Sequence, residues 1–302
     1  MPHGWIILDK PLGLGSTQAV AAVKRNLREA GYGKKVKVGH GGTLDPLASG
    51  VLPIAVGEAT KLTGRMLDAS KAYLFTVRFG EQTDTLDLEG KVVAISDVRP
   101  AMAEIEAVLP RFTGPIDQVP PAYSALKVDG ERAYDLARAG QEVELKSRAV
   151  TIYDLQIVPE PGAEGQVTLL ARVSKGTYIR SLARDMALAL GSCGTVTMLR
   201  RAQAGPFTLS QAISLDKLNE VGKGAPLEQI LLPLEAGLDD IPAIDLDPEQ
   251  ARAVRQGRVL TGMPHEDGLY CAYEGIVLVA LVQLSDREVR VVRGFNLSDV
   301  AE

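Results

Sequence analysis

One short loop combines a single acidic side chain with residues that can hold it in place. Residues 40–50 read HGGTLDPLASG, and Asp45 is the only acid among them. The glycines allow positive φ angles and a close approach of the backbone to another group, and Pro46 restricts Asp45 to extended geometry. A carboxylate held beside open backbone could serve nucleophilic or proton-transfer chemistry.

Two other interpretations of this loop compete with a reactive site. Asp45 could be an ordinary turn residue or the cap of the next segment, which is the commoner role of Asp in a loop rich in Gly and Pro. A phosphate-binding loop is disfavoured, because the Gly-Lys-Ser/Thr ending is missing and Asp45 would repel phosphate. The loop therefore needs support from other side chains.

Two other segments offer that support. Residues 73–79 alternate with period two, so Tyr73 begins the core-facing side of a predicted strand, where it could also be an ordinary core tyrosine. Arg180 falls in the first turn of a predicted helix capped by Thr177, where the positive end of the helix dipole disfavours a cation. We expect Arg180 to have an anionic partner, and Asp45 is the candidate.

The predicted elements alternate between strands and helices. Residues 4–9 predict a strand, followed by a helix that Ser16 would cap and that presents cations on one face. Further strands are predicted at 150–157 and 166–174, and a helix at 100–109. Residues 118–150 are irregular apart from a short helix at 132–138, and we interpret them as an insertion standing off the sheet.

The last quarter of the chain predicts a second domain. Prolines and carboxylates between residues 233 and 249 predict a linker. A short helix is predicted at 251–260, and the alternating segments after residue 269 predict a small β-barrel. A domain of this size is expected to depend on docking against the main body.

Charge is distributed unevenly along the chain, whose net charge is -5. Residues 1–40 carry seven Lys/Arg against two acids, and residues 165–205 carry six against one, whereas residues 206–250 carry two against nine. If the two basic segments meet, they form a surface for a polyanion that the net charge conceals. The alternative is two separate solvated faces.

Membrane and metal-binding classes are disfavoured. No stretch of about 18 uncharged apolar residues exists, and the N-terminus lacks the form of a secretion signal, which predicts a cytoplasmic protein. Cys193 and Cys271, together with three histidines, show no zinc-ligand spacing, so we expect no metal.

Residues 39–52, GHGGTLDPLASGVL, closely resemble the active-site motif of the TruB family of tRNA pseudouridine synthases. Further motifs of that family follow the same order, and the resemblance covers about residues 4–232. These motifs are residues 8–13 (LDKPLG), 71–73 (KAY), 80–90 around TDT, 118–130, 174–183 (SKGTYIRSLA) and 199–201 (LRR).

The resemblance implies a fold and a domain organisation. The fold is α+β, with a mixed, largely antiparallel sheet flanked by helices and a small C-terminal PUA-like β-barrel. Residues 1–240 would form the catalytic domain, residues 118–150 an RNA-clamping insertion, and residues 245–302 the RNA-binding barrel.

The resemblance also implies site residues. Asp45 would be the catalytic carboxylate, Tyr73 the ring that stacks on the target uracil, and Arg180 the cation paired with Asp45. His40, Tyr178 and Leu199 would line the RNA site, because a base-modifying enzyme takes its target out of the stack. Lys10 would be either a structural residue or a contact to a backbone phosphate.

The implied reaction converts uridine 55 in the T loop of tRNA to pseudouridine without a cofactor. Asp45 could attack uracil C6, attack ribose C1′ or remove a C2′ proton, and the sequence does not choose among these steps. The expected partner is the T-arm stem-loop, bound by a stand-alone monomer. Two competing classes are a non-catalytic RNA-binding scaffold and a guide-RNA-dependent relative within a ribonucleoprotein.

Overall fold

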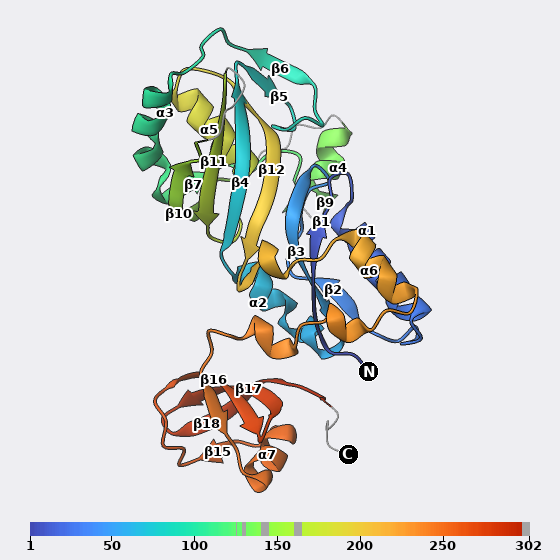
Figure 1. Ribbon diagram of the computed structural model, residues 1–302. Helices are drawn as coiled ribbons and strands as arrows, with labels where there is room; N and C mark the ends of the chain where they lie inside the picture. The colour runs from blue at the N-terminus through green and yellow to red at the C-terminus, as the bar shows by residue number, and fades with distance from the viewer. Residues whose placement is uncertain (125, 129–130, 140–144, 160–164, 298–302) are drawn as a thin grey trace.

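The computed structural model describes residues 1–124, 126–128, 131–139, 145–159 and 165–297, and it is built on one mixed sheet (Figure 1). The strand order is β1-β3-β12-β4-β11-β10-β7, with β2 added to β3 and β13 to β12. All neighbours are antiparallel except β3 and β12, so the predicted α+β class is confirmed. The strands are β1 (Gly4–Lys10), β2 (Val38–His40), β3 (Ala48–Val56), β4 (Lys71–Phe79), β7 (Gly114–Gln118), β10 (Arg148–Ile157), β11 (Gln166–Val173), β12 (Gly194–Ala204) and β13 (Phe207–Thr208).

The parallel pair joins two halves of this sheet. Leu199 of β12 lies opposite Ala48 of β3, and Arg201 lies opposite Gly50. On its other edge β12 pairs with β4, where Arg201 is opposite Tyr73. The register therefore places the end of the Asp45 loop one strand away from Tyr73, with β12 between them.

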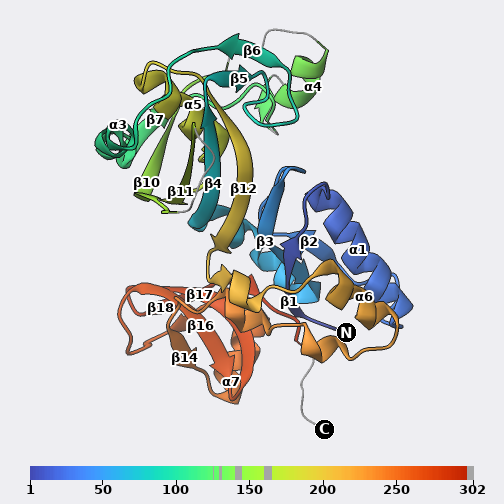
Figure 2. The ribbon, with the colours of Figure 1, turned by 45° about the horizontal axis from the view of Figure 1, so that its top comes forward.

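Helices cover the two halves separately (Figures 1 and 2). α1 (Ser16–Glu29) and α6 (Leu215–Gly222) pack on β1 and β3, whereas α5 (Ile179–Ala189) and α3 (Met102–Val108) pack on β4, β10 and β11. Tyr73 and Leu199 are partly buried against both apolar clusters, so they lie at the seam between the halves.

Both predicted helix caps are wrong by about one residue. α1 begins at Ser16 with Gly15 as its N-cap, and the Ser16 hydroxyl bonds to Leu44 instead of to its own helix. α5 begins at Ile179 with Tyr178 as its N-cap, while Thr177 donates to the Ser174 carbonyl over 3.0 Å. Both hydroxyls have hydrogen-bond partners outside their own helix, and the local sequence does not indicate those partners.

The segment between β4 and β10 also contains short elements. They are β5 (Glu81–Thr83), β6 (Val92–Ile95), β8 (Lys127–Val128), β9 (Glu131–Arg132) and α4 (Ala133–Arg138), which matches the helix predicted at 132–138. Short helical turns also occur: η1 (Gly57–Leu62), α2 (Thr63–Asp68), η2 (Leu109–Phe112), η3 (Leu209–Gln211), η4 (Leu227–Gln229) and η5 (Leu234–Gly237). Residues 125, 129–130 and 140–144 of the predicted insertion lie outside the described residues.

The C-terminal part forms a five-stranded sheet, as the predicted PUA-like β-domain requires. Its order is β14-β16-β17-β18-β15, from β14 (Ala243–Asp245), β15 (Leu260–Thr261), β16 (Gly268–Glu274), β17 (Val277–Ser285) and β18 (Glu288–Gly294). β14 and α7 (Pro248–Arg255) occupy part of the predicted linker, which is therefore more structured than expected.

The C-terminal sheet docks on the main body through a shared apolar cluster. Trp5 and Phe207 of the main body belong to the same buried cluster as Cys271, Leu278 and Phe295. This contact fits the expectation that a small domain depends on docking. Within the described part of the chain, no helix combines the length and apolarity needed to cross a bilayer.

Candidate active site

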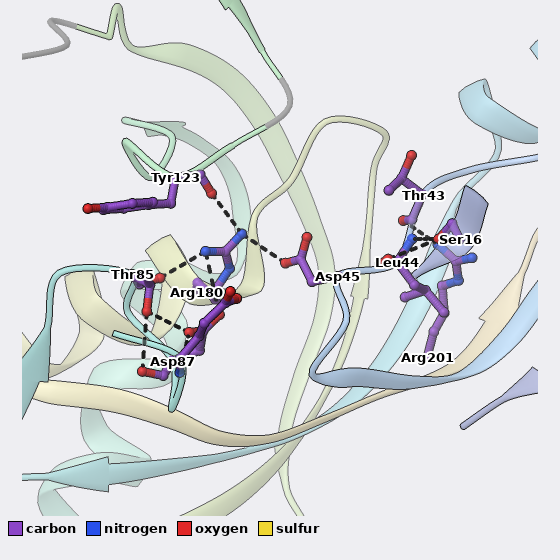
Figure 3. Close-up of polar contacts among 10 residues, drawn as sticks. Ser16, Thr43, Leu44, Asp45, Thr85, Asp87, Tyr123, Arg180 and Arg201 are labelled. Atoms are coloured by element: carbon purple, nitrogen blue, oxygen red, sulfur yellow. Dashed lines mark hydrogen bonds and ion pairs between the residues drawn. The ribbon is translucent and has the colours of Figure 1, made fainter. Parts of the chain in front are cut away.

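Asp45 lies in the loop between β2 and β3 and points at Arg180 (Figure 3). Its Oδ2 atom is 2.8 Å from Arg180 Nη2, so the ion pair expected from the helix-dipole argument is present. The Asp45 side chain is 42% exposed, whereas that of Arg180 is 6% exposed. A fixed, buried cation therefore holds a carboxylate that remains open to a ligand.

Arg180 is held independently of Asp45 (Figure 3). Its Nη1 atom donates to the Thr85 carbonyl over 2.8 Å and its Nη2 atom to the Tyr123 carbonyl over 3.1 Å. Asp87 Oδ2 lies 3.6 Å from Nη1, with its side chain 11% exposed. The guanidinium is thus shared between two carboxylates, of which Asp45 is the more exposed.

Asp87 is a site residue that the sequence reasoning missed. Thr85 Oγ1 donates to its Oδ1 atom over 2.6 Å, and the Glu89 amide donates to the same oxygen over 3.0 Å. From sequence, residues 80–90 were one of the motifs shared with the TruB family, but Asp87 was given no role in the site. The available signal was the buried Arg180 itself, since one exposed partner rarely compensates a buried guanidinium.

Three groups fix the backbone around Asp45. The Ser16 hydroxyl accepts from the Leu44 amide over 2.8 Å and donates to the Leu44 carbonyl over 2.9 Å. The Gly13 amide donates to the Pro46 carbonyl over 2.8 Å. Arg201 donates to carbonyls on both sides of the loop. The residues before and after Asp45 are therefore both anchored.

Lys10 also anchors the Asp45 loop, from the protein interior. It is fully buried, and its Nζ atom donates to the carbonyls of Leu14 at 2.6 Å, Pro11 at 3.0 Å and Pro46 at 3.3 Å. Burial lowers the pKa of Lys10 to about 8, although the charge of Asp45 opposes that shift. The structure therefore favours the structural role for Lys10, because a buried ammonium cannot reach an RNA phosphate.

A cavity of about 290 Å³ opens beside the ion pair and brings together five of the predicted residues. Asp45, Tyr73, Tyr178, Arg180 and Leu199 all line it. The cavity lies at the seam, so residues more than a hundred positions apart in the chain meet in one recess.

Tyr178 is positioned by its main chain and by a cation. Its amide donates to Gln118 Oε1 over 2.8 Å, and the Arg148 guanidinium lies 5.7 Å from its ring centre. Burial raises the pKa of the Tyr178 phenol, which therefore stays neutral at physiological pH. A neutral phenol can donate or accept a hydrogen bond in the cavity.

His40 lines a neighbouring hollow of about 500 Å³ that shares Asp45 and Arg180 with the first. Its Nδ1 atom accepts from the Gly42 amide over 3.4 Å. Burial lowers the pKa of His40, and the charge of Arg201 lowers it further, so the imidazole is neutral near pH 7. A third, apolar hollow of about 250 Å³ with Leu12, Leu47 and Leu88 on its walls also reaches the ion pair.

Another hollow, of about 670 Å³, lies between α2, residues 203–206 and residues 237–240. Arg65 in its wall is paired with Asp240, and Asp68 and Asp239 add further negative charge. An acidic wall would repel an RNA backbone. The chemistry and the charge both favour the smaller recess at Asp45.

Only one of the two basic segments forms an exposed basic face. Lys24, Arg25 and Arg28 are exposed on α1, and Lys34, Lys35 and Lys37 are exposed after it. The cations of residues 165–205 are mostly buried or paired within the protein, so they add little to such a face, and one joint surface of the two segments stays a prediction. Their contacts are Arg180 with Asp45, Arg201 with main-chain carbonyls, Arg200 with Asp9, Arg184 with Asp185 and Lys175 with Asp68.

Comparisons with known proteins give matches in sequence and in structure. Residues 28–179 match the TruB family pseudouridylate synthase (N terminal domain), and residues 180–239 match the tRNA pseudouridylate synthase B C-terminal domain. The chain is 73% identical to tRNA pseudouridine synthase B of Novosphingobium aromaticivorans over the full length of both chains. It is 58% identical to the protein of that name from Zymomonas mobilis, covering 97% of this chain and 96% of the other.

Solved structures share the fold across both domains. A chain in the "Structure of H/ACA RNP bound to a substrate RNA containing 2'-deoxyuridine" superimposes with a TM-score of 0.73 at 25% identity, covering 98% of this chain and 86% of that one. A chain in the "Crystal Structure of a Cbf5-Nop10-Gar1 Complex" gives 0.72 at 26% identity, covering 98% and 84%. With the sequence matches, these likenesses establish that the chain belongs to the TruB family of pseudouridylate synthases.

Proposed function

We propose that this protein is a tRNA pseudouridine synthase that isomerises uridine 55 of the T loop, with Asp45 as the catalytic carboxylate. The observation that carries the proposal is the Asp45–Arg180 ion pair in the wall of a recess that also holds Tyr73 and Tyr178. The relatives named tRNA pseudouridine synthase B support the choice of tRNA as substrate.

The recess suits a nucleotide that has left its stack. A uracil inside an RNA helix is inaccessible to a carboxylate in a recess, so the target nucleotide is flipped out. Tyr73 offers a ring on which the base stacks, and Leu199 offers apolar contact next to it. Tyr178, as a neutral phenol, supplies a hydrogen-bonding group on the same wall.

The reaction breaks the bond between N1 of uracil and C1′ of ribose, turns the base and joins its C5 to C1′, and the proton lost from C5 is balanced by the proton that N1 gains. Asp45 serves this exchange by attack on C6, by attack on C1′ or by removal of the C2′ proton, and all three fit its position. Arg180 favours the ionised carboxylate that each of these steps requires. The isomerisation consumes no oxidant or reductant, so the proposed enzyme needs no cofactor.

The proposed substrate contact extends beyond the recess. The exposed cations on α1 and on residues 34–37 provide a phosphate-binding face near the start of the Asp45 loop. Residues 118–150 act as the clamp over the RNA, and the C-terminal sheet adds affinity. The protein works as a monomer and without a guide RNA.

The proposal is tested by incubating the purified protein alone with each of three RNAs and measuring pseudouridine. The RNAs are an unmodified T-arm stem-loop, full-length tRNA and a stem-loop whose target uridine is replaced by cytidine. We expect pseudouridine in the first two RNAs at similar kcat/KM, because RNA is read by loop shape and splayed bases. Binding without conversion would indicate a scaffold. Conversion only after addition of a guide RNA would indicate a guided enzyme.

A further inference from the structure

Arg201 is a buried cation whose side-chain hydrogen bonds go to the Asp45 loop and to the start of β3 that follows it. Its side chain lies under the loop and is 1% exposed. Nε donates to the Val51 carbonyl over 2.7 Å, Nη2 to the Gly42 carbonyl over 3.1 Å and Nη1 to the Thr43 carbonyl over 3.3 Å. One guanidinium therefore joins the backbone on both sides of Asp45.

The backbone of Arg201 is fixed to the same loop. Arg201 lies opposite Gly50 in the parallel pairing of β12 with β3. Gly50 has a φ angle of +101°, and a Cβ atom there would lie 2.2 Å from the Arg201 carbonyl oxygen. Only glycine permits so close an approach. The main chain of Arg201 therefore fixes the end of the loop at Gly50, while its side chain binds the backbone on both sides of Asp45.

The charge of Arg201 has no acidic counterpart among the described residues, where no ion pair to it is present. Burying a guanidinium without a carboxylate is costly, and a guanidinium does not lose its proton to avoid that cost. The three carbonyl oxygens are what compensates the charge. Loop position and cation burial are therefore coupled, since moving the loop would leave a buried cation without acceptors.

We propose that Arg201 is the positioning residue of this active site, holding the backbone on both flanks of Asp45 so that the carboxylate meets Arg180 and faces the recess. This inference rests on the proposed function. The planar fork of arginine reaches three divergent carbonyls at fixed angles, which the point charge of lysine does not reproduce. Arg180 is then the charge partner of Asp45, and Arg201 fixes the position of the backbone that carries Asp45.

The test compares Arg201→Gln and Arg201→Lys in the full-length chain, with single-turnover kinetics and RNA binding measured on the same T-arm stem-loop. We expect Arg201→Gln to lower kcat about 100-fold, because a misplacement of about 1 Å costs that much in a positioned reaction. Arg201→Lys keeps the charge and should restore part of that loss. The Kd for the stem-loop should stay within about threefold, because a residue that is 1% exposed contributes little direct phosphate contact.

Leu218→Ala is the matched control for a core defect. Leu218 lies on α6, is fully buried in the apolar cluster that α6 shares with α1, and lies outside the site. This variant should unfold at a lower temperature but keep the wild-type kcat. If Leu218→Ala and Arg201→Gln lose the same amount of kcat for the same loss of stability, Arg201 is only a structural residue and the proposal is wrong.

A second perturbation reaches the same contact from the loop side. Gly50→Ala leaves the guanidinium intact but forces β3 away from β12, so we expect a loss of kcat at unchanged stem-loop Kd. If Arg201→Gln is insoluble, Arg201→Lys decides, and a wild-type kcat in that variant overturns the proposal. An inactive wild type would refute the proposed function instead. An active wild type with an inactive Asp45→Asn and a fully active Arg201→Gln would refute only the positioning role.

Discussion

Asp87→Asn tests whether the second carboxylate holds Arg180 in place. The substitution keeps the size of the side chain and removes its charge, while the Thr85 and Tyr123 carbonyls continue to accept from the guanidinium. The effect of Asp87→Asn therefore measures how much the charge of Asp87 stabilises Arg180, apart from the hydrogen bonds that Arg180 donates to the two carbonyls.

The structure sets the magnitude of this effect. At 3.6 Å and an effective dielectric constant of about 20, the Coulomb attraction between Asp87 and Arg180 is about 4–5 kcal/mol. Desolvation of the two groups offsets most of it, so we expect a net loss of about 1–2 kcal/mol. A loss of about 1.4 kcal/mol in holding Arg180 against Asp45 corresponds to about a tenfold lower kcat.

The assay measures kcat, stem-loop Kd and the thermal midpoint of Asp87→Asn beside Asp84→Asn. Asp84 lies in the same loop, but its carboxylate accepts from the Lys91 amide over 2.9 Å and is not in the Arg180 network. We expect a tenfold loss of kcat, unchanged Kd and a midpoint lowered by a few degrees for Asp87→Asn only. Wild-type kcat in Asp87→Asn, or an equal loss in Asp84→Asn, would refute the reasoning.

Three further outcomes follow from the charges in the structure. Stem-loop binding should weaken steeply with salt. Changing Lys34, Lys35 and Lys37 together to Gln should reduce the slope of log K against log salt, measured by titration, by about two to three; an unchanged slope would place the RNA elsewhere. Because the pKa of Lys10 falls from 10.5 to about 8 on folding, the unfolded chain binds more protons between these values, so the unfolding free energy of the wild type should rise from pH 8 to 10 relative to Lys10→Met. A parallel pH dependence of the two proteins in denaturant titrations would contradict that assignment. EDTA should leave turnover intact, and inhibition reversed by one specific divalent ion would show that the site uses a metal.

Local physical arguments made Asp45 the candidate partner of Arg180, and the resemblance to the TruB family supplied its catalytic role. Arg180 stood at a helix end that disfavours cations, and Asp45 stood in a loop that fixes a carboxylate. The alternation of residues 73–79 placed Tyr73 on the inner face of β4, where the structure has it. These arguments require only the period of an element and the chemistry of one side chain.

The missed features depend on contacts between distant segments. Arg201 counted as a surface cation in the sequence, but β12 lies in the middle of the sheet and turns this side chain beneath the loop. Ser16 was predicted as a cap, yet its hydroxyl bonds to Leu44, which lies 28 positions later. No periodic pattern encodes which carbonyl a buried donor will reach, so the supports of Asp45 required the structure.

The most direct test of the central claim is pseudouridine formation by Asp45→Asn, measured by nucleoside chromatography after single-turnover reaction with a T-arm stem-loop. The substitution removes the reactive carboxylate and preserves its size, so we expect no detectable pseudouridine and a stem-loop Kd within about tenfold of the wild type. Turnover above a few per cent of the wild-type rate, with the variant folded and bound to RNA, would contradict a catalytic role for Asp45.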